Sequence, residues 1–149
     1  MKLSTKGRYG LRAAVALAMY AKDEPVSIST IAAREELSES YLEQLFAKLK
    51  KAGLVHSIRG TNGGYQLSRP AEDISVGDVL RALEGNMVIV DCPDSESQCA
   101  KYGSCVTKYV WKRINNSIND TMDAITLEEL VLNSDGMTEQ KGQKAYCSK

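Results

Sequence analysis

The chain has 149 residues, 43% of them hydrophobic and 26% charged, which suits one soluble globular domain with an appended element. We expect no membrane-spanning segment, because no apolar run is long enough to cross a bilayer. The net charge of zero is unevenly divided: residues 1–70 hold eleven Lys and Arg against six Asp and Glu, and residues 71–149 hold eight against thirteen. Unless this division is chance, the basic half suits phosphate contacts on one face.

A first helix is predicted over residues 6–21, ended by the run Lys22–Pro25. Its basic start and apolar continuation also resemble a secretory signal peptide. The apolar run is short and alanine-rich, however, and its stripe could pack on later helices. This stripe consists of Leu11, Ala14, Val15 and Ala18. We therefore expect a cytoplasmic protein with reduced cysteines, rather than a secreted protein with disulfides.

A helix-turn-helix is predicted next. A short helix near residues 31–36, capped by Ser29 or Thr30, leads through a turn at Leu37–Ser38 into a second helix. The apolar stripe of the second helix is Leu42, Leu45, Phe46 and Leu49. Ser38 and Ser40 are both plausible N-caps, and Ser40 with Glu43 fits a capping box.

A β-hairpin should follow directly. Strand-like runs at Val55–Ile58 and Tyr65–Leu67 flank a glycine-rich turn that contains Asn62-Gly63. Asn-Gly favours a tight hairpin, because both residues tolerate positive φ. A helix-turn-helix with a hairpin wing predicts a protein that binds duplex DNA.

The second half is predicted to be mostly helical. A helix over residues 76–83 precedes a long connection, 85–105, and a long amphipathic helix over 106–124. The stripe of the long helix is Val106, Val110, Ile114, Ile118, Met122 and Ile125. We interpret this helix as a dimerisation helix; the alternative is a plain core helix. Thr126 should cap a last helix over 127–132, and the polar tail that follows should be disordered.

Three cysteines, Cys92, Cys99 and Cys105, lie in one polar, turn-forming segment. Clustered thiolates of this kind suit zinc or an iron–sulfur cluster. Thiol redox sensing and inert cysteines are the alternatives. No fourth cysteine or histidine lies nearby, since the single histidine, His56, belongs to a wing strand and Cys147 lies in the tail.

Several motifs occur in an order that resembles the IscR-like iron–sulfur regulators of the Rrf2 family of bacterial repressors. They are LSTKGRYGL, LSESYLEQLF, GLVHSIRGTNGGYQL, ISVGDVLRALEG and the cysteine trio, and the resemblance covers about residues 1–132. It implies a homodimeric winged-helix repressor of cluster-assembly genes that binds operator DNA and obtains its cluster from assembly proteins. It also implies a [2Fe–2S] cluster held by Cys92, Cys99 and Cys105, although the first cysteine gap is one residue longer here.

The fourth cluster ligand departs from the family pattern. The family places a histidine three residues after the third cysteine, where this chain has Lys108. Nitric-oxide-sensing relatives use an aspartate near the start of the partner's first helix, where this chain has Arg8. The candidates that could complete the site are Asp91, Asp94, Glu96, Glu43 across an interface, solvent, or Cys147 folding back from the tail.

The resemblance places DNA contacts at the head of the second helix, and the side-chain chemistry agrees. Gln44 can bond bidentately to adenine, and Glu43 can accept a hydrogen bond from cytosine. Ser38, Ser40 and Tyr41 can contact bases or phosphates. Two alternatives stay open: Glu43 as a capping-box carboxylate only, and Tyr41 packed beneath the helix.

Two further kinds of contact are expected. Lys48 and Lys51 should mainly meet phosphates, which position a protein without reading sequence. Arg59 should enter a narrow minor groove from the wing, with Gly60 allowing close approach.

The predicted fold class is mainly α (α+β): a winged helix-turn-helix domain with a two-stranded wing, plus a long dimerisation helix. We divide the chain into a DNA-binding domain (1–84), a cluster-binding loop (85–105), a dimerisation and short C-terminal helix (106–132) and a tail (133–149). The predicted function is a cluster-sensing transcription repressor. A thiol- or zinc-based repressor without iron is the alternative, and a module that binds a metabolic enzyme through the wing is a third. We expect no enzymatic activity, because the sequence offers no nucleophile–histidine pair and no nucleotide-binding motif.

Overall fold

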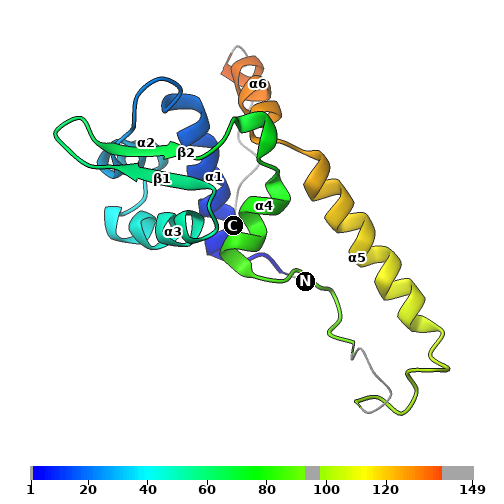
Figure 1. The fold of residues 1–149 in the computed structure, drawn as a ribbon. Coiled ribbons are helices and arrows are strands. Elements are labelled where there is room, and N and C mark those ends of the chain that lie inside the picture. Colours follow the sequence, from blue (N-terminus) through cyan, green and yellow to red (C-terminus); the bar gives the residue numbers. More distant parts are fainter. Residues whose placement is uncertain (1, 93–97, 139–149) are drawn as a thin grey trace.

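The computed structural model describes residues 2–92 and 98–138, which form six α-helices and a two-stranded antiparallel sheet (Figure 1). The elements are α1 (Thr5–Tyr20), α2 (Ile28–Glu35), α3 (Glu39–Lys51), β1 (Val55–Ile58), β2 (Gly64–Leu67), the 3₁₀ turn η1 (Ala71–Asp73), α4 (Val76–Glu84), α5 (Thr107–Ala124) and α6 (Leu127–Thr138). The predicted fold class, a mainly helical winged helix-turn-helix with a long additional helix, is confirmed. Among the described residues, no helix combines the length and apolar character needed to span a bilayer.

Both helices of the helix-turn-helix are capped by a serine: α2 by Ser27, where Ser29 or Thr30 is predicted, and α3 by Ser38, one of its two predicted caps. Ser27 caps α2, and its Oγ accepts a hydrogen bond from the backbone N–H of Thr30 at 3.2 Å. The predicted start at residue 31 is therefore wrong. Ser38 caps α3 by accepting from the N–H of Tyr41 at 3.2 Å, so the predicted capping box of Ser40 and Glu43 is wrong.

The wing is a regular hairpin. Val55 pairs with Leu67 and Ile58 with Gly64, so residues 59–63 form the turn. The positive φ expected at Asn62-Gly63 is wrong, because the turn takes its positive φ angles at Gly60 and Gly64. The backbone of Tyr65 also bonds in both directions to Val26, at 2.8 and 3.0 Å. This bridge fixes the segment before α2 in an extended conformation. It leaves Ser27 as the first residue free to cap the helix.

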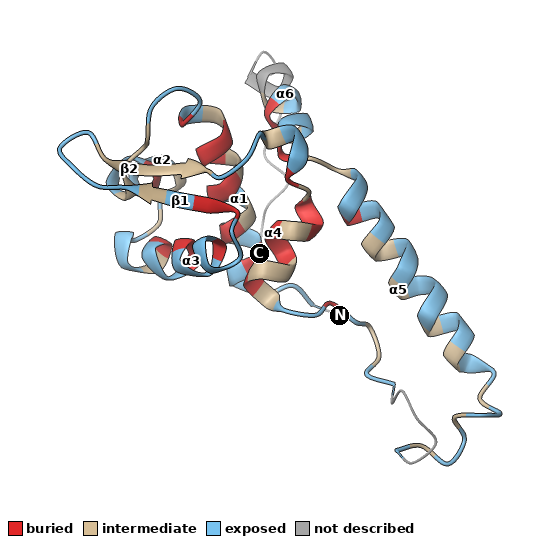
Figure 2. Cartoon of the chain, in the orientation of Figure 1, coloured by how far each residue is buried: buried red, intermediate tan, exposed pale blue. Residues whose placement is uncertain are grey.

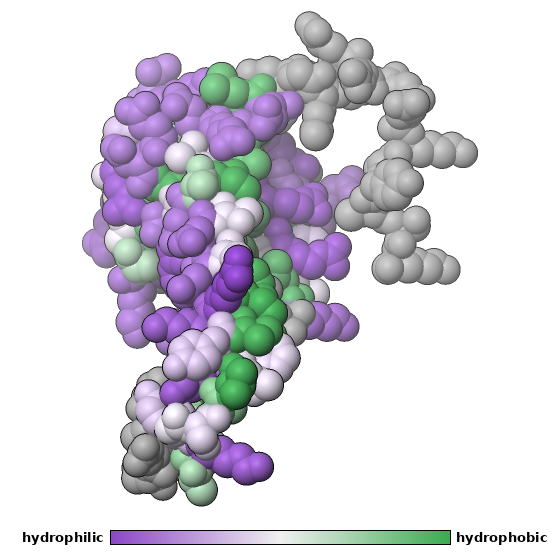
Figure 3. All heavy atoms as spheres, turned by 90° about the vertical axis from the view of Figure 1, so that its right-hand side faces the viewer, coloured by the Kyte–Doolittle hydropathy of each residue, from purple (hydrophilic) through white to green (hydrophobic). Residues whose placement is uncertain are grey.

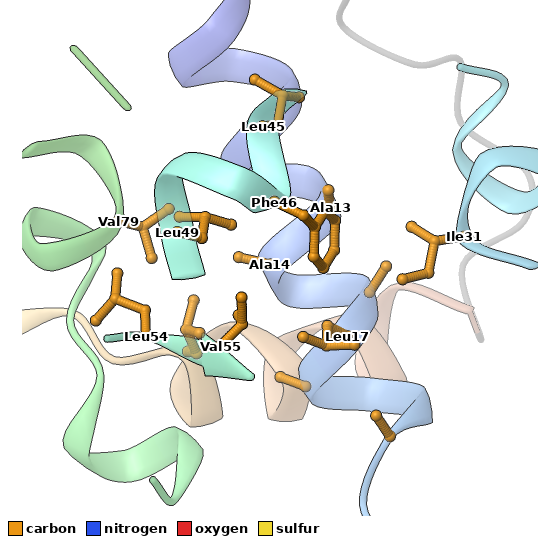
Figure 4. Close-up of a cluster of buried hydrophobic side chains, with 14 of the residues drawn as sticks. Ala13, Ala14, Leu17, Ile31, Leu45, Phe46, Leu49, Leu54, Val55 and Val79 are labelled. Atoms are coloured by element: carbon orange, nitrogen blue, oxygen red, sulfur yellow. The ribbon is translucent and has the colours of Figure 1, made fainter. Parts of the chain in front are cut away.

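One apolar cluster joins α1, α2, α3, the wing and α6. The stripe predicted for α3 supplies four of its fully or almost fully buried side chains: Leu42, Leu45, Phe46 and Leu49. Figure 4 shows Phe46 beside Ala13 of α1, and Leu49 directed toward Val79 of α4. The Phe46 ring also meets the Tyr65 ring edge-on, with centroids 4.8 Å apart. This packing fixes the orientation of α3, so its opposite face is presented to solvent.

Helices α1 and α4 approach each other closely because α1 carries glycine at the contact. A Cβ atom on Gly10 would overlap the side chain of Leu83, and one on Gly7 would meet the carboxylate of Glu84. At this contact Glu84 accepts hydrogen bonds from the backbone N–H groups of Ser4 (3.0 Å) and Gly7 (2.9 Å) and from the Ser4 hydroxyl (2.5 Å). A carboxylate from α4 therefore satisfies free donors at the N-terminus of α1, which has no acidic residue in its own first turn.

Glu84→Gln is expected to lower the free energy of unfolding by about 1–2 kcal/mol at pH 7, since charge-assisted hydrogen bonds are lost. The Ser4 hydroxyl and the other donors hold the pKa of Glu84 below its ordinary value. A depressed folded-state pKa contributes stability that is present above the unfolded pKa and is lost as the pH falls through the folded value. The difference between wild type and variant should therefore shrink below about pH 4.5, the ordinary value. Urea unfolding at several pH values measures it.

Glu72→Gln is the control for Glu84→Gln, because it removes the same charge at an exposed residue of η1. We expect Glu72→Gln to change the unfolding free energy by less than about 0.5 kcal/mol. Equal effects of the two substitutions at pH 7, or a Glu84→Gln deficit that persists unchanged in acid, would contradict the assigned role of Glu84.

The last helix, α6, is longer than predicted. Thr126 caps it as expected, with its hydroxyl accepting from the N–H of Glu129 at 3.2 Å, but the helix continues to Thr138 instead of ending at 132. Leu127 and Val131 are buried in the same apolar cluster as the buried residues of α1, which anchors α6 to α1. The first residues of the predicted tail, 133–138, are thus helical. Residues 139–149, which include Cys147, lie outside the described part of the chain.

The long helix α5 agrees with its predicted start within one residue, and only its C-terminal half packs on the domain. There Met122 is buried with Val76 and Leu80 of α4. Arg81 of α4 also binds α5, with one guanidinium nitrogen 3.2 Å from the Asn119 side-chain oxygen and another paired with Asp123. The N-terminal half of α5 extends away from the other helices (Figures 1 and 2).

Candidate DNA-binding face and cysteine loop

Helix α3 and the wing lie on the same side of the molecule, and α5 lies on the opposite side (Figure 1). Since the apolar stripe of α3 is buried, the helix exposes a continuous polar face. The exposed residues of α3 are Glu39, Ser40, Glu43, Gln44, Ala47, Lys48, Lys50 and Lys51. A helix with this exposure beside a hairpin has the geometry that places base-reading side chains in a major groove.

The structure brings together three of the residues predicted to contact DNA. Ser40, Glu43 and Gln44 are all exposed, and their spacing of three and four residues puts them on one face of α3. Ser38 is also exposed, but its hydroxyl is engaged as the helix cap. Its available role at a DNA surface is to hold the helix N-terminus in place.

Two predicted contacts are arranged differently. Tyr41 is half-buried and meets the ring of Tyr9 edge-on at 6.3 Å, and its buried hydroxyl has no hydrogen-bond partner among the described residues. The packed alternative for Tyr41 is thus the observed arrangement. Lys48 is exposed, but its ammonium donates to the backbone carbonyl of Leu83 in α4 at 3.1 Å. It is directed toward α4 and not toward the centre of the exposed face.

The tip of the wing carries Arg59 and Gly60, both exposed. Gly60 has φ +120°, a conformation that L side chains rarely adopt, so glycine is required for this turn. Sequence analysis missed Lys50, whose ammonium donates to the Ser57 hydroxyl of β1 at 2.6 Å and joins the end of α3 to the wing. Its spacing of seven residues from Glu43 could have indicated it, because two helical turns return to the same face.

The described part of α5 carries an apolar stripe that is exposed at its N-terminal end. The exposed fraction is 78% for Val106, 49% for Val110 and 37% for Ile114, and the stripe becomes buried toward Met122. Tyr109 beside it is 68% exposed. Figure 3 shows green apolar side chains running along this face of the helix. A contiguous exposed apolar face on a single helix is typical of a protein–protein contact.

The cysteine segment begins at the end of α4 and leads into the N-terminal end of α5, far from the wing (Figure 1). Cys92, Cys99 and Cys105 are free thiols; Cys92 is exposed and the other two are partly exposed. Residues 93–97, which contain the candidate ligands Asp94 and Glu96, lie outside the described residues. Within the described ranges, no three Cys, His, Asp or Glu side chains are grouped closely enough to hold a metal ion.

Lys108, at the position of the family histidine, is fixed by other contacts. Its ammonium donates to the backbone carbonyl of Tyr102 at 2.7 Å and lies 4.4 Å from the centre of the Tyr102 ring. A protonated amine of this kind has no lone pair for iron. Lys108 therefore closes the loop between Tyr102 and α5 instead of offering a ligand.

Cys105 lies beside groups that favour its thiolate form. The Thr107 hydroxyl, 3.3 Å from its sulfur, is the largest cause that lowers the pKa of Cys105, and the backbone N–H and charge of Lys108 act in the same direction. A lowered thiol pKa increases the thiolate fraction at neutral pH. The thiolate is both the metal ligand and the redox-active form.

Comparison with known proteins agrees with this geometry. Residues 3–133 match the family model described as "Rrf2: Iron-dependent Transcriptional regulator". An HTH-type transcriptional regulator of Haemophilus influenzae is 45% identical over 131 residues, which cover 88% of this chain and 87% of the relative.

Two solved structures are similar over most of the chain. IscR of T. potens has a TM-score of 0.71 and 44% identity, covering 97% of this chain and 94% of that one. CymR, described as the global cysteine regulator of B. subtilis, has a TM-score of 0.73 and 40% identity, covering 89% and 98%. The chain is about equally similar to both proteins, so overall similarity does not identify the signal that it senses. The cysteine segment has to be considered for that purpose.

Proposed function

The chain belongs to the Rrf2 family of transcriptional regulators, and on this premise we propose that it is a homodimeric repressor that senses iron–sulfur status through a [2Fe–2S] cluster. In this proposal residues 1–84 bind operator DNA, 85–105 hold the cluster and 106–132 form the dimer. Its target genes would be those of cluster assembly, whose products would also donate the cluster. The observation that carries the proposal is the placement of three thiols on one exposed segment at the end of α5, away from the DNA-binding face.

DNA binding would use the exposed face of α3 and the wing tip. Gln44 suits bidentate bonds to adenine, and Glu43 suits an acceptor bond from cytosine, because both side chains are exposed on the outward face of α3. Ser40 would add a polar contact from the first turn. Arg59 and Gly60 would meet a narrow minor groove from the wing tip, where the positive φ of Gly60 keeps the turn small.

Dimerisation would bury the stripe of Val106, Val110 and Ile114 against a second copy. The described residues offer this stripe no intramolecular partner at its N-terminal end, although the C-terminal end of the same stripe is covered by α4. The exposed half of this apolar face is removed from water only when another protein surface covers it. A two-fold dimer would also present two copies of α3 to two operator half-sites.

Three cysteine ligands suit a [2Fe–2S] cluster chemically, but a fourth ligand is still needed. Cys92, Cys99 and Cys105 are the residues that would hold it, because thiolates are the usual ligands of [2Fe–2S] irons. The bound cluster would supply a redox-active and oxygen-sensitive group to this segment. The described side chains have to move to gather around it, since they are not grouped as a metal site in the free chain. The fourth ligand would come from Asp91, Asp94, Glu96, the partner's Glu43, Cys147 or solvent. A carboxylate or solvent in this position would leave the cluster more labile than four strong ligands would.

A thiol- or zinc-based sensor of the same fold is the second candidate. Two observations favour it: the lowered pKa of Cys105, and the similarity to a structure described as a global cysteine regulator. In that case the same three cysteines would respond by oxidation or zinc binding, without iron. Operator binding by α3 and the wing would be unchanged.

Metal analysis of anaerobically purified protein tests the proposal. We expect about two irons and about two acid-labile sulfides per chain, with visible absorption from a [2Fe–2S] cluster, and loss of all three in the triple variant Cys92/Cys99/Cys105→Ala. The matched control is Cys147→Ala, which removes the remaining cysteine and should keep the cluster. Loss of the cluster in Cys147→Ala would identify this residue as the fourth ligand. Colourless, iron-free wild-type protein would contradict the cluster and favour the thiol or zinc sensor.

A further inference from the structure

Three elements meet at the C-terminal end of α4: α3, which is the proposed recognition helix, α1 and the cysteine segment. Lys48 of α3 donates to the Leu83 carbonyl at 3.1 Å, and the next residue, Glu84, caps the N-terminus of α1. Two elements of the DNA-binding domain are therefore attached to two consecutive residues of α4. The chain leaves this point directly toward Cys92.

The Lys48 contact has a clear physical basis. Helix α4 ends at Glu84, and Gly85 turns away with φ +84°, so the Leu83 carbonyl belongs to the last turn, whose carbonyls lack intrahelical partners. A cation at this end also interacts favourably with the helix dipole. The hydrogen bond to the Leu83 carbonyl and the helix dipole therefore both stabilise Lys48 in this position.

The segment between α4 and the first cysteine is held at two points. Met87 is buried with Val76, Leu80 and Met122, and the backbone N–H of Ile89 donates to the Asn115 side chain of α5 at 2.9 Å. Cys92 follows three residues later, with its own N–H bonded to the Val90 carbonyl at 3.0 Å. This short tether joins Cys92 to Leu83 and Glu84 at the end of α4. A displacement of Cys92 would therefore reach the end of α4 through the contacts of Met87 and Ile89.

We propose that Lys48 is a positioning residue that couples the recognition helix to the state of the cysteine segment, and that it is not a phosphate contact. The inference rests on the proposed sensing function, because it assigns the route by which the cysteines influence α3. Displacement of the α4 terminus would be passed to α3 through the Lys48–Leu83 hydrogen bond and to α1 through Glu84. Lys51 serves as the contrast, since it is exposed on the same helix and belongs to the DNA-facing side.

The test compares Lys48→Met with Lys51→Met, each with intact cysteines and in the Cys92/Cys99/Cys105→Ala background. Operator affinity is measured anaerobically by fluorescence anisotropy over a range of salt concentrations. Affinity falls as salt rises, and losing one phosphate contact makes the slope of log affinity against log salt less steep by about 0.9. We expect this decrease for Lys51→Met and an unchanged slope for Lys48→Met.

The cysteine background gives the second readout. We expect intact and triple-alanine proteins to differ in operator affinity by at least about fivefold when Lys48 is present, the lower end of ordinary coupling between sites. Lys48→Met should bring this ratio to within about twofold. Lys48→Arg retains a donor for the Leu83 carbonyl and should preserve the ratio. Equal melting temperatures of the three Lys48 forms would show that the effect is not loss of folding.

Each alternative result has a defined meaning. A Lys48→Met slope that falls as in Lys51→Met, with the cysteine ratio intact, overturns the inference and makes Lys48 a phosphate contact. A cysteine ratio that stays at its full value in Lys48→Met with an unchanged slope overturns the coupling alone. A ratio near one in the protein with native Lys48 overturns the proposed sensing by the cysteines, and the coupling falls with it.

Discussion

Val110→Glu is expected to convert the protein to monomers and to weaken operator binding by at least about 100-fold. Val110 is 49% exposed in the middle of the apolar stripe of α5, where we propose that a second copy packs. By two-fold symmetry a dimer would bury two new carboxylates. An uncompensated buried charge costs about 3–5 kcal/mol, and each 1.4 kcal/mol is about a tenfold change in affinity. Sedimentation equilibrium measures the dimer, and anisotropy with a two-half-site operator measures DNA affinity.

Asn116→Glu is the matched control, because it adds the same charge to the same helix. Asn116 is exposed and lies six residues after Val110, about 120° around the helix from it. The control should remain dimeric and should bind the operator within about threefold of wild type, as expected for a surface substitution. If Val110→Glu stays dimeric with native operator affinity, the α5 stripe is not the dimer contact.

The fold could be predicted largely because its main signals are local. The periodic stripe of α3, the glycine-rich hairpin and the amphipathic α5 are indicated by neighbouring residues, and the structure confirms all three elements. The hairpin turn, however, has its positive φ angles at Gly60 and Gly64 and not at Asn62-Gly63. The start of α2 is predicted wrongly, since Ser29 and Thr30 are suitable caps by residue type but Ser27, which is not among the predicted caps, caps the helix. The decision comes from the bridge between Val26 and Tyr65, about forty residues apart in the sequence, which no local pattern contains.

The candidate site residues also differ in whether local spacing or tertiary contacts determine where their side chains lie. The resemblance and side-chain chemistry select Ser40, Glu43 and Gln44; the structure exposes all three on one face of α3, and their contact with DNA stays a prediction. Helical spacing leaves Lys48 and Tyr41 at the edge of that face, where the neighbouring helix decides their direction: Tyr41 packs against Tyr9 and Lys48 bonds to Leu83. The role of Glu84 depends on a contact across 80 residues. These contacts depend on how α1, α3 and α4 pack together, so they cannot be predicted from the spacing of residues along one helix.

The cysteine segment shows why spacing alone is insufficient for a metal site. Three thiols within fourteen residues predict a common ligand, but backbone conformation determines whether their sulfur atoms meet. In the described residues they are not grouped, and Lys108 is occupied by the Tyr102 carbonyl. The fourth position is therefore the point at which this chain should differ most from IscR-like relatives.

Lys108→His is expected to stabilise a cluster held by the three cysteines. Histidine is an established ligand of [2Fe–2S] irons, whereas the Lys108 ammonium has no lone pair to donate. Supplying a strong fourth ligand three residues after Cys105 should slow loss of the visible absorption in air by at least about tenfold, the lower end of effects seen when a metal shell is altered. Lys108→Gln is the control, because it also breaks the bond to the Tyr102 carbonyl but adds no imidazole. If both variants lose the cluster at the wild-type rate, position 108 does not reach the irons in this chain. Faster loss in both would instead make the Lys108–Tyr102 bond the feature that holds the loop around the cluster.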